Sequence, residues 1–121
     1  MNTHQTTIVE RNTIVSFFIN QLAQDIHTLA VEKGWWEKER NDGELIALMH
    51  SELSEALEWL RNGNKADDKI PQFSGVEAEL ADCIIRILDM AAARGYRIGE
   101  AIIAKHEFNK TREIRHGGKA F

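Results

Sequence analysis

Glycine residues divide this chain into four segments in which apolar side chains recur at three- and four-residue spacing. That spacing places apolar residues on one face of an α-helix, and the strict alternation typical of half-buried strands is scarce. The only proline is Pro71, so none of the four segments is interrupted by a residue that breaks helices. The pattern predicts an all-α protein, with the helices arranged as a four-helix bundle or a close relative.

Capping residues give the expected helix boundaries. The first helix should cover about residues 13–33 and end at Gly34, with an apolar stripe made of Val15, Phe18, Leu22, Ile26 and Leu29. The second should cover residues 44–61, begin after Asn41 or Asp42 as N-cap, and stop at Asn62-Gly63. Residues 1–12 are expected to be loosely ordered.

The other two helices are bounded in the same way. Ser74 and Glu77 have the spacing of a capping box, which predicts a third helix from there to Arg94, before Gly95. A fourth helix should cover residues 99–116, before Gly117-Gly118. Residues 64–73 are expected to form a polar connecting loop within a single domain that covers residues 1–121.

Composition excludes several classes of protein. The net charge of −4 argues against a broad surface for nucleic-acid polymers, which is normally basic. Cys83 is the only cysteine, so one chain can form neither a disulfide nor a Cys-based zinc site. The sequence shows neither a signal-peptide core nor an apolar run near the ~20 residues of a membrane span. We therefore expect a cytoplasmic protein without a membrane partner.

Carboxylates interrupt the apolar surface of the second and third helices. Glu52 and Glu55 occupy positions where the stripe of Leu45, Leu48 and Trp59 calls for apolar residues. On the third helix the acids are Glu79 and Asp82, in a polar stripe that continues with Arg86 and Asp89. Residues at i and i+3 share one helix face, so an antiparallel pair of helices would bring the two acidic pairs together.

Such a cluster needs a neutralising charge. Two carboxylates about 5 Å apart repel each other by roughly 3 kcal/mol at an effective dielectric near 20. Protonation or a bound cation relieves that repulsion, and ligation by oxygen alone suits Mg²⁺ or Mn²⁺ better than zinc. The other interpretation is a solvated face whose acids pair with lysine and arginine. Two such motifs on consecutive helices favour a divalent-metal site.

The paired motifs resemble those of the MazG-like all-α NTP pyrophosphatases. The similarity covers most of the chain. It includes Gly34-Trp35-Trp36, Ser51-Glu52-Leu53-Ser54-Glu55-Ala56, Glu79-Leu80-Ala81-Asp82 and Lys105-His106-Glu107-Phe108-Asn109-Lys110-Thr111-Arg112. The resemblance implies Mg²⁺-dependent hydrolysis of a (d)NTP to the monophosphate and pyrophosphate, typically in nucleotide-pool house-cleaning. It also implies a homodimer or homotetramer, with Mg²⁺ bound by Glu52, Glu55, Glu79 and Asp82.

The motifs leave open which residue acts as the general base. Some relatives have a glutamate immediately before the first motif, where this chain has Ser51. A carboxylate in a crowded acidic cluster can accept a proton from water. Glu52 is therefore the expected catalytic base, with the other three acids mainly as metal ligands.

The fourth helix carries the expected phosphate-binding residues. Lys105, Asn109 and Arg112 fall at i, i+4 and i+7, and Lys110 is adjacent. With the resemblance, we expect Lys105 and Asn109 to contact phosphate, and Lys110 or Arg112 to add positive charge. Without it, an ordinary basic helix end is equally consistent.

Two tryptophans precede the first motif. Trp35 and Trp36 are possible surfaces for stacking of the nucleobase. Residues of this type more often close a core or a subunit interface.

Two other functions are compatible with acids inside a helical bundle. A di-iron carboxylate protein would carry two Glu-x-x-His motifs, and this chain has only Glu113-x-x-His116. A non-catalytic nucleotide-binding or regulatory module would have the same fold, but the complete set of acids favours catalysis.

Overall fold

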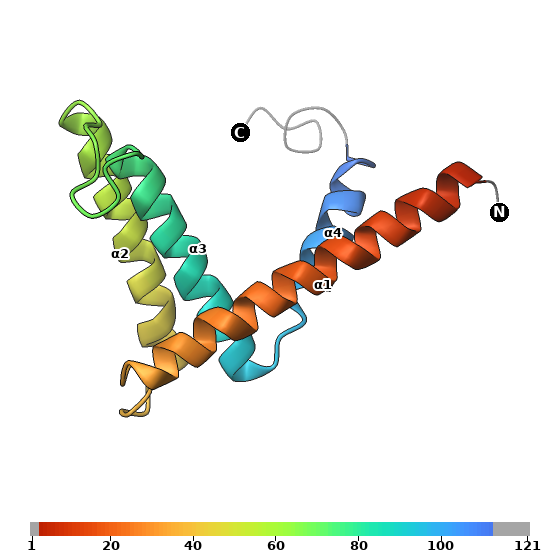
Figure 1. The fold of residues 1–121 in the computed structure, drawn as a ribbon, viewed down its shortest axis with the longest axis horizontal. Helices are drawn as coiled ribbons and strands as arrows, with labels where there is room; N and C mark the ends of the chain where they lie inside the picture. The colour runs from red at the N-terminus through yellow and green to blue at the C-terminus, as the bar shows by residue number, and fades with distance from the viewer. Residues whose placement is uncertain (1–2, 113–121) are drawn as a thin grey trace.

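The computed structural model describes residues 3–112, which fold into four α-helices joined by short connections (Figure 1). The helices are α1 (Thr3–Glu32), α2 (Asp42–Arg61), α3 (Gly75–Arg94) and α4 (Ile98–Asn109). The all-α, four-helix prediction is confirmed. No helix in the described range is long and apolar enough to cross a membrane.

The ends of α2 and α3 lie where the capping residues predict. The Asn41 side chain accepts a hydrogen bond from the Glu44 amide at 2.8 Å. Ser74 and Glu77 form a reciprocal capping box at the start of α3, and Gly95 ends that helix with φ +70°. Left-handed backbone of this kind costs glycine little. Local capping thus sets the start of both helices and the end of α3.

The boundaries of α1 and α4 differ from the prediction. Helix α1 begins at Thr3, ten residues before the expected start. Residues 3–12 continue the helix, and no capping signal in the sequence marks where it begins. Helix α4 ends at Asn109 and is followed by a turn through Arg112. The predicted end at His116 lies outside the described residues, as does the Glu113-x-x-His116 motif.

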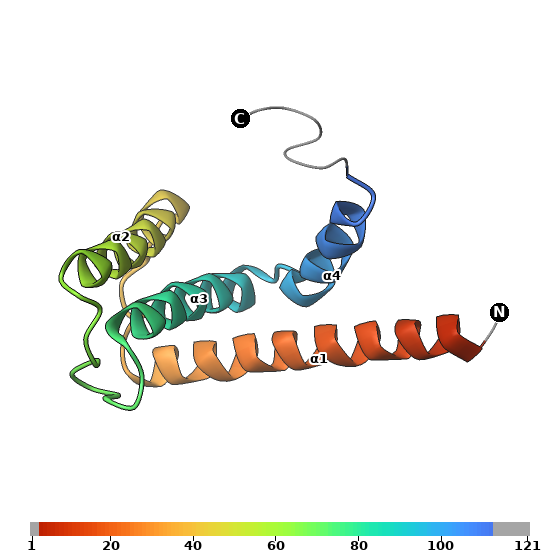
Figure 2. The ribbon, with the colours of Figure 1, turned by 90° about the horizontal axis from the view of Figure 1, so that it is seen from above.

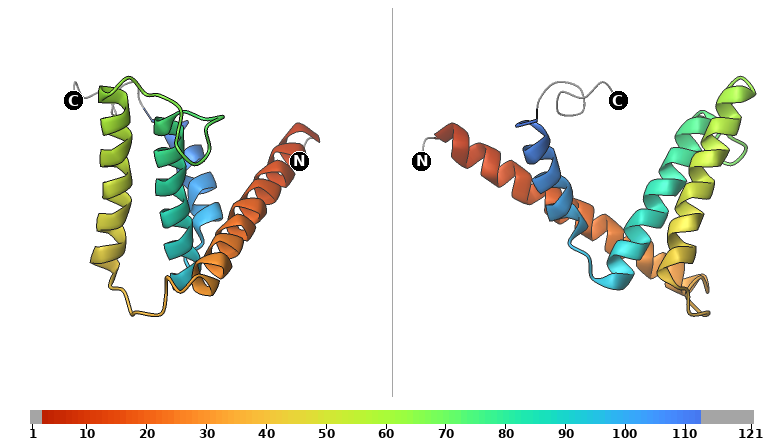
Figure 3. Two further views of the ribbon diagram at one scale, coloured as in Figure 1. Left: turned by 60° about the vertical axis from the view of Figure 1, so that its left-hand side comes forward. Right: turned by 180° about the vertical axis from the view of Figure 1, so that it is seen from behind.

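The helices form two arms instead of closing around a common core. Helices α2 and α3 lie antiparallel, side by side, as a hairpin, and α1 crosses the base of α3 (Figures 1 and 3). Helix α4 packs along the more N-terminal part of α1, which makes the second arm (Figure 2). Helix α3 is therefore the element that packs against both α2 and α1.

The buried apolar core lies between the two hairpin helices. It consists of Leu45, Met49, Cys83 and Met90, with Trp36 and Ile87 packed against it. The predicted stripe of α1 is largely uncovered in the single chain: Phe18 is 63% exposed, and Leu22 and Leu29 are more than half exposed. The reason is that α3 and α4 together cover only part of the surface of α1.

A polar joint connects the two arms where α1 crosses α3. The buried Asp89 carboxylate on α3 lies 2.8 Å from Nδ1 of His27 on α1. The Trp36 indole N–H lies 3.1 Å from each Asp89 oxygen, and its ring contacts His27 edge to face. Each member of this buried polar group thus has a partner, as stable burial requires.

Candidate metal centre

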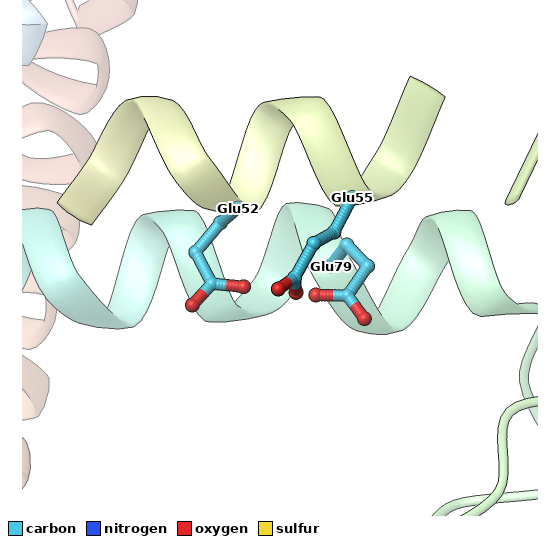
Figure 4. Close-up of side chains that lie close together, drawn as sticks. All are labelled: Glu52, Glu55 and Glu79. Atoms are coloured by element: carbon cyan, nitrogen blue, oxygen red, sulfur yellow. The ribbon is translucent and has the colours of Figure 1, made fainter. Parts of the chain in front are cut away.

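Three glutamates from the two hairpin helices converge on one point. Glu52 and Glu55 project from α2 and Glu79 from α3, each offering a carboxylate oxygen within 4.8 Å of the others (Figure 4). Glu52 is buried, Glu79 is half-buried and Glu55 is exposed, so the group lies at the surface with one side open. The prediction that the two motifs face each other is confirmed for these three residues.

Asp82 lies beside this group rather than within it. Its side chain is exposed, and it does not share the 4.8 Å cluster. Burial of its carboxyl and, next, the negative charge of Glu52 raise the pKa of Asp82 above its usual value. The fourth predicted ligand is therefore an electrostatic neighbour of the group, and its ligand role stays a prediction.

Arg86 is the cation that the hairpin itself supplies to the acids. Its Nε atom donates to Oε1 of Glu52 at 2.9 Å. Burial raises the pKa of Glu52, but hydrogen bonds from Arg86 and then Glu79 outweigh it, so the pKa lies below its usual value. Glu52 is thus held as a carboxylate. The sequence contained the signal, because Arg86 lies seven residues after Glu79 on the same polar stripe of α3.

Glu79 has the opposite protonation tendency. Its burial, followed by the neighbouring carboxyl groups of Glu52 and Glu55, raises its pKa to about 7. Without a cation, a proton held by Glu79 relieves the repulsion among the three acids. Its Oε2 is buried and has no hydrogen-bond partner within the described part of the chain. An orphaned buried oxygen in an acidic cluster is a position that a cation would satisfy.

Trp59 holds the other oxygen of Glu79, a role that sequence reasoning missed. Its indole N–H donates to Oε1 of Glu79 at 3.3 Å. The ring packs directly on Gly75 at the start of α3, where an added Cβ would lie 1.9 Å from Cδ2 of the indole. Only glycine leaves room for this close approach. Gly75 thereby fixes the position of Trp59, and Trp59 orients Glu79.

Two clefts open next to the acids. One, of about 310 Å³, is lined by Glu55, Trp59 and Glu79 together with Glu58 and Asn62. The other, of about 430 Å³, lies between α3 and the connection that precedes it, and Glu79 and Asp82 line its helical side. The acids are therefore reachable by a solute larger than a metal ion.

The predicted phosphate-binding residues lie on the other arm. Lys105 and Asn109 line a groove on α4, and α4 packs on α1 away from the acids (Figures 1 and 2). The Lys110 ammonium pairs with Glu107 at 2.8 Å, and Arg112 lies beyond the helix end. One chain does not bring these four residues to the glutamates, because the crossing of α1 and α3 separates the arms.

The two tryptophans before α2 occupy different environments. Trp35 lies under two guanidinium groups, those of Arg40 at 4.4 Å and Arg86 at 5.1 Å from the ring centroid. It also lines an apolar cleft of about 310 Å³ between α1 and α3. Trp36 is part of the Asp89 joint. Of the two candidates for base stacking, Trp35 is the one that lines this cleft, whereas the indole of Trp36 is hydrogen-bonded to Asp89.

Three carboxylates, one of which has an orphaned oxygen, make this a group that can hold a metal ion. All-oxygen donors suit a hard divalent cation. The chain matches no family model, no curated protein and no solved structure.

Proposed function

We propose that this chain is a Mg²⁺-dependent nucleoside triphosphate pyrophosphohydrolase, which cleaves a (d)NTP to the monophosphate and pyrophosphate. The observation that carries the proposal is the convergence of Glu52, Glu55 and Glu79 from two helices. The motif resemblance across residues 34–112 supports the reaction class. House-cleaning of the nucleotide pool is the physiological role typical of proteins with these motifs.

Glu52, Glu55 and Glu79 would hold the cation, with Asp82 beside them. Mg²⁺, or Mn²⁺ in its place, would supply charge neutralisation for the phosphates. Glu52 is the proposed base, because Arg86 keeps it ionised and an ionised carboxylate can accept a proton from an attacking water. Trp35, which faces the apolar cleft, is the proposed surface for the nucleobase.

We further propose that the chain functions as a homodimer or homotetramer. Phe17 and Phe18 on α1 are 60% and 63% exposed, and more than half of Leu60 and Ile84 on the hairpin is also exposed. A second copy that covers these faces would bury the apolar side chains and could bring its α4 cations toward the acids.

The direct test is pyrophosphate release from a panel of canonical and modified NTPs and dNTPs, with Mg²⁺ or with EDTA. We expect Mg²⁺-dependent release together with a monophosphate, and a loss of roughly a hundredfold or more for Glu52→Gln. Glu44→Gln is the matched control, because Glu44 is an exposed acid of α2 whose carboxylate pairs with Arg40, away from the three clustered glutamates. Folded protein that binds nucleotides but releases no pyrophosphate would instead be a binding module.

The assembly is tested by sedimentation equilibrium. The wild-type chain should sediment at twice or four times its mass, and Phe18→Ser should shift the equilibrium toward the monomer. Thr28→Ser serves as a conservative control on the same helix. A wild-type monomer at all accessible concentrations would exclude the oligomer.

A further inference from the structure

The connection between α2 and α3 folds back against α3. Its ends are tied together by an isolated bridge between Ala66 and Ser74. The Asn64 side chain accepts from the Val76 amide at 2.9 Å, and the Lys65 carbonyl accepts from the Gly75 amide at 2.8 Å. The polar loop predicted for residues 64–73 is therefore a structured element docked on the start of α3.

Within this loop, Asp67 fixes the backbone of Lys69. One carboxylate oxygen of Asp67 accepts from the amides of Lys69 and Ile70, at 2.9 and 3.0 Å. The Asp67 amide in turn donates to the Phe73 carbonyl at 2.9 Å. Such Asx turns hold a short segment in one conformation without regular secondary structure. The position from which the Lys69 side chain extends is consequently well defined.

Lys69 lines the larger cleft beside the acids. Residues 67–70 form the loop side of that cleft, and Glu79 and Asp82 lie on its α3 side. Lys69 is the only cationic residue among those lining the cleft within the described chain. Its charge also acts on Asp82, where it favours the ionised form. Four acids line the same cleft, namely Asp67, Asp68, Glu79 and Asp82, so Lys69 is the residue there that can attract an anion.

A metal-bound polyphosphate has two kinds of oxygen to satisfy. Some oxygens contact the divalent ion, and the remaining ones keep negative charge that needs donors from the protein. Arg86 is already bonded to Glu52, and the basic residues of α4 lie on the other arm. A lysine ammonium on a flexible stem is a common phosphate donor because it acts as a point charge.

We propose that Lys69 binds the phosphate chain of the substrate in the cleft between residues 67–70 and α3, on the same subunit as the metal-binding glutamates. The proposal rests on the proposed function only in taking a magnesium-bound polyphosphate as the ligand. It assigns a substrate-binding role to residues 67–70, which belong to none of the motifs that carry the family resemblance.

The test measures binding of inorganic pyrophosphate in the presence of Mg²⁺ by titration calorimetry, with the full chain. Lys69→Gln should weaken binding by about tenfold, the value typical of one charge-assisted contact. Lys65→Gln is the matched control in the same loop, outside the lining of the cleft, and should change affinity less than about twofold. Lys69→Arg should restore most of the affinity, whereas a structural defect would not be rescued by charge.

The outcomes separate the two proposals. If Lys69→Gln binds magnesium pyrophosphate as tightly as Lys65→Gln does, Lys69 has no such role, even if the wild-type enzyme hydrolyses triphosphates. If wild-type protein binds the probe through Lys69 but releases no pyrophosphate from any nucleotide, the catalytic proposal fails and the binding role stands. Absence of any binding to wild-type protein overturns the role of Lys69, whereas the catalytic proposal is decided by pyrophosphate release from the nucleotide panel.

Discussion

The two arms of this molecule are built differently. The α2–α3 hairpin has capped helix ends, a buried core around Met49 and Cys83, and the acidic group on its open face. The α1–α4 arm has a long helix whose apolar side chains are mostly uncovered and a short α4 whose N-cap position, Arg97, makes no side-chain cap. The hairpin thus has a buried core of its own, whereas the other arm leaves most of its apolar side chains uncovered in the single chain, where the proposed oligomer would cover them.

Each arm contains one glycine at a point of closest approach. Gly75 lies against the Trp59 ring, and at Gly99 an added Cβ would lie 2.3 Å from the Ser16 carbonyl oxygen. Both helices meet their neighbours where no side chain fits. Alanine at each site therefore probes its own arm.

The largest effect is expected for Gly75→Ala. The new methyl group must displace the indole of Trp59, and overpacking of this kind costs about 3 kcal/mol. Urea denaturation should show the loss, together with a weaker Mg²⁺ response because Trp59 orients Glu79. Gly43→Ala in α2, where the nearest side-chain atom is 3.3 Å away, should stay within about 1 kcal/mol of wild type. Equal stability of the two variants would contradict the close packing described here.

Asp89→Ala should be next, with a loss of about 2 kcal/mol in the free energy of unfolding. The substitution leaves the Trp36 indole and His27 without their shared acceptor. The matched control is Asp42→Ala, since Asp42 forms an exposed pair with Arg94 and should cost less than about 1 kcal/mol. Thermal unfolding of both variants would compare a buried acceptor with an exposed one.

Gly99→Ala should cost about 1–2 kcal/mol and affect one arm selectively. Hydrogen exchange should become faster in α4 while α2 and α3 keep their protection, because the clash lies only at the α1–α4 contact. Faster exchange throughout the hairpin would show that the arms unfold as one unit.

The smallest expected effect is on the pH dependence of the free energy of unfolding. In the metal-free protein the pKa of Glu79 is raised from 4.5 to about 7, so the folded state holds a proton that the unfolded state releases. The resulting stabilisation is fully present at pH values below the unfolded-state pKa of Glu79 and is lost as pH rises through about 7. Glu79→Gln should remove this part of the pH dependence when unfolding is followed in EDTA.

The same variant tests the metal response. Mg²⁺ should raise the melting temperature of wild type increasingly as pH rises through about 7, because binding to the folded state alone stabilises it and requires the proton to leave. Glu79→Gln should lose most of this gain. If Mg²⁺ raises the melting temperature of Glu79→Gln as much as that of wild type, Glu79 is not a metal ligand.

The α2–α3 hairpin was more predictable from the sequence than the α1–α4 arm. The ends of the hairpin helices were predictable because Asn41, Ser74 and Gly95 act on their own neighbours. The facing of Glu52 and Glu79 followed from helix periodicity and a short connection. These features depend on interactions close along the chain.

The remaining features depend on how helices cross. Nothing local indicates that α1 starts at Thr3, that Asp89 accepts from Trp36, or that α4 packs away from the acids. The placement of Lys69 in the cleft that Glu79 also lines likewise results from tertiary packing of a polar loop. The roles of Lys105 and Asn109 stay predictions because α4 packs on α1, on the arm away from the acids.

The Asp89 joint has a mechanical consequence for the acidic group. Arg86, which holds Glu52, and Asp89, which holds His27 and Trp36, lie three residues apart on α3, less than one turn of helix. A rotation of α3 about its axis would move both contacts together. A change in the angle between the arms would therefore be transmitted through α3 to the position of Glu52.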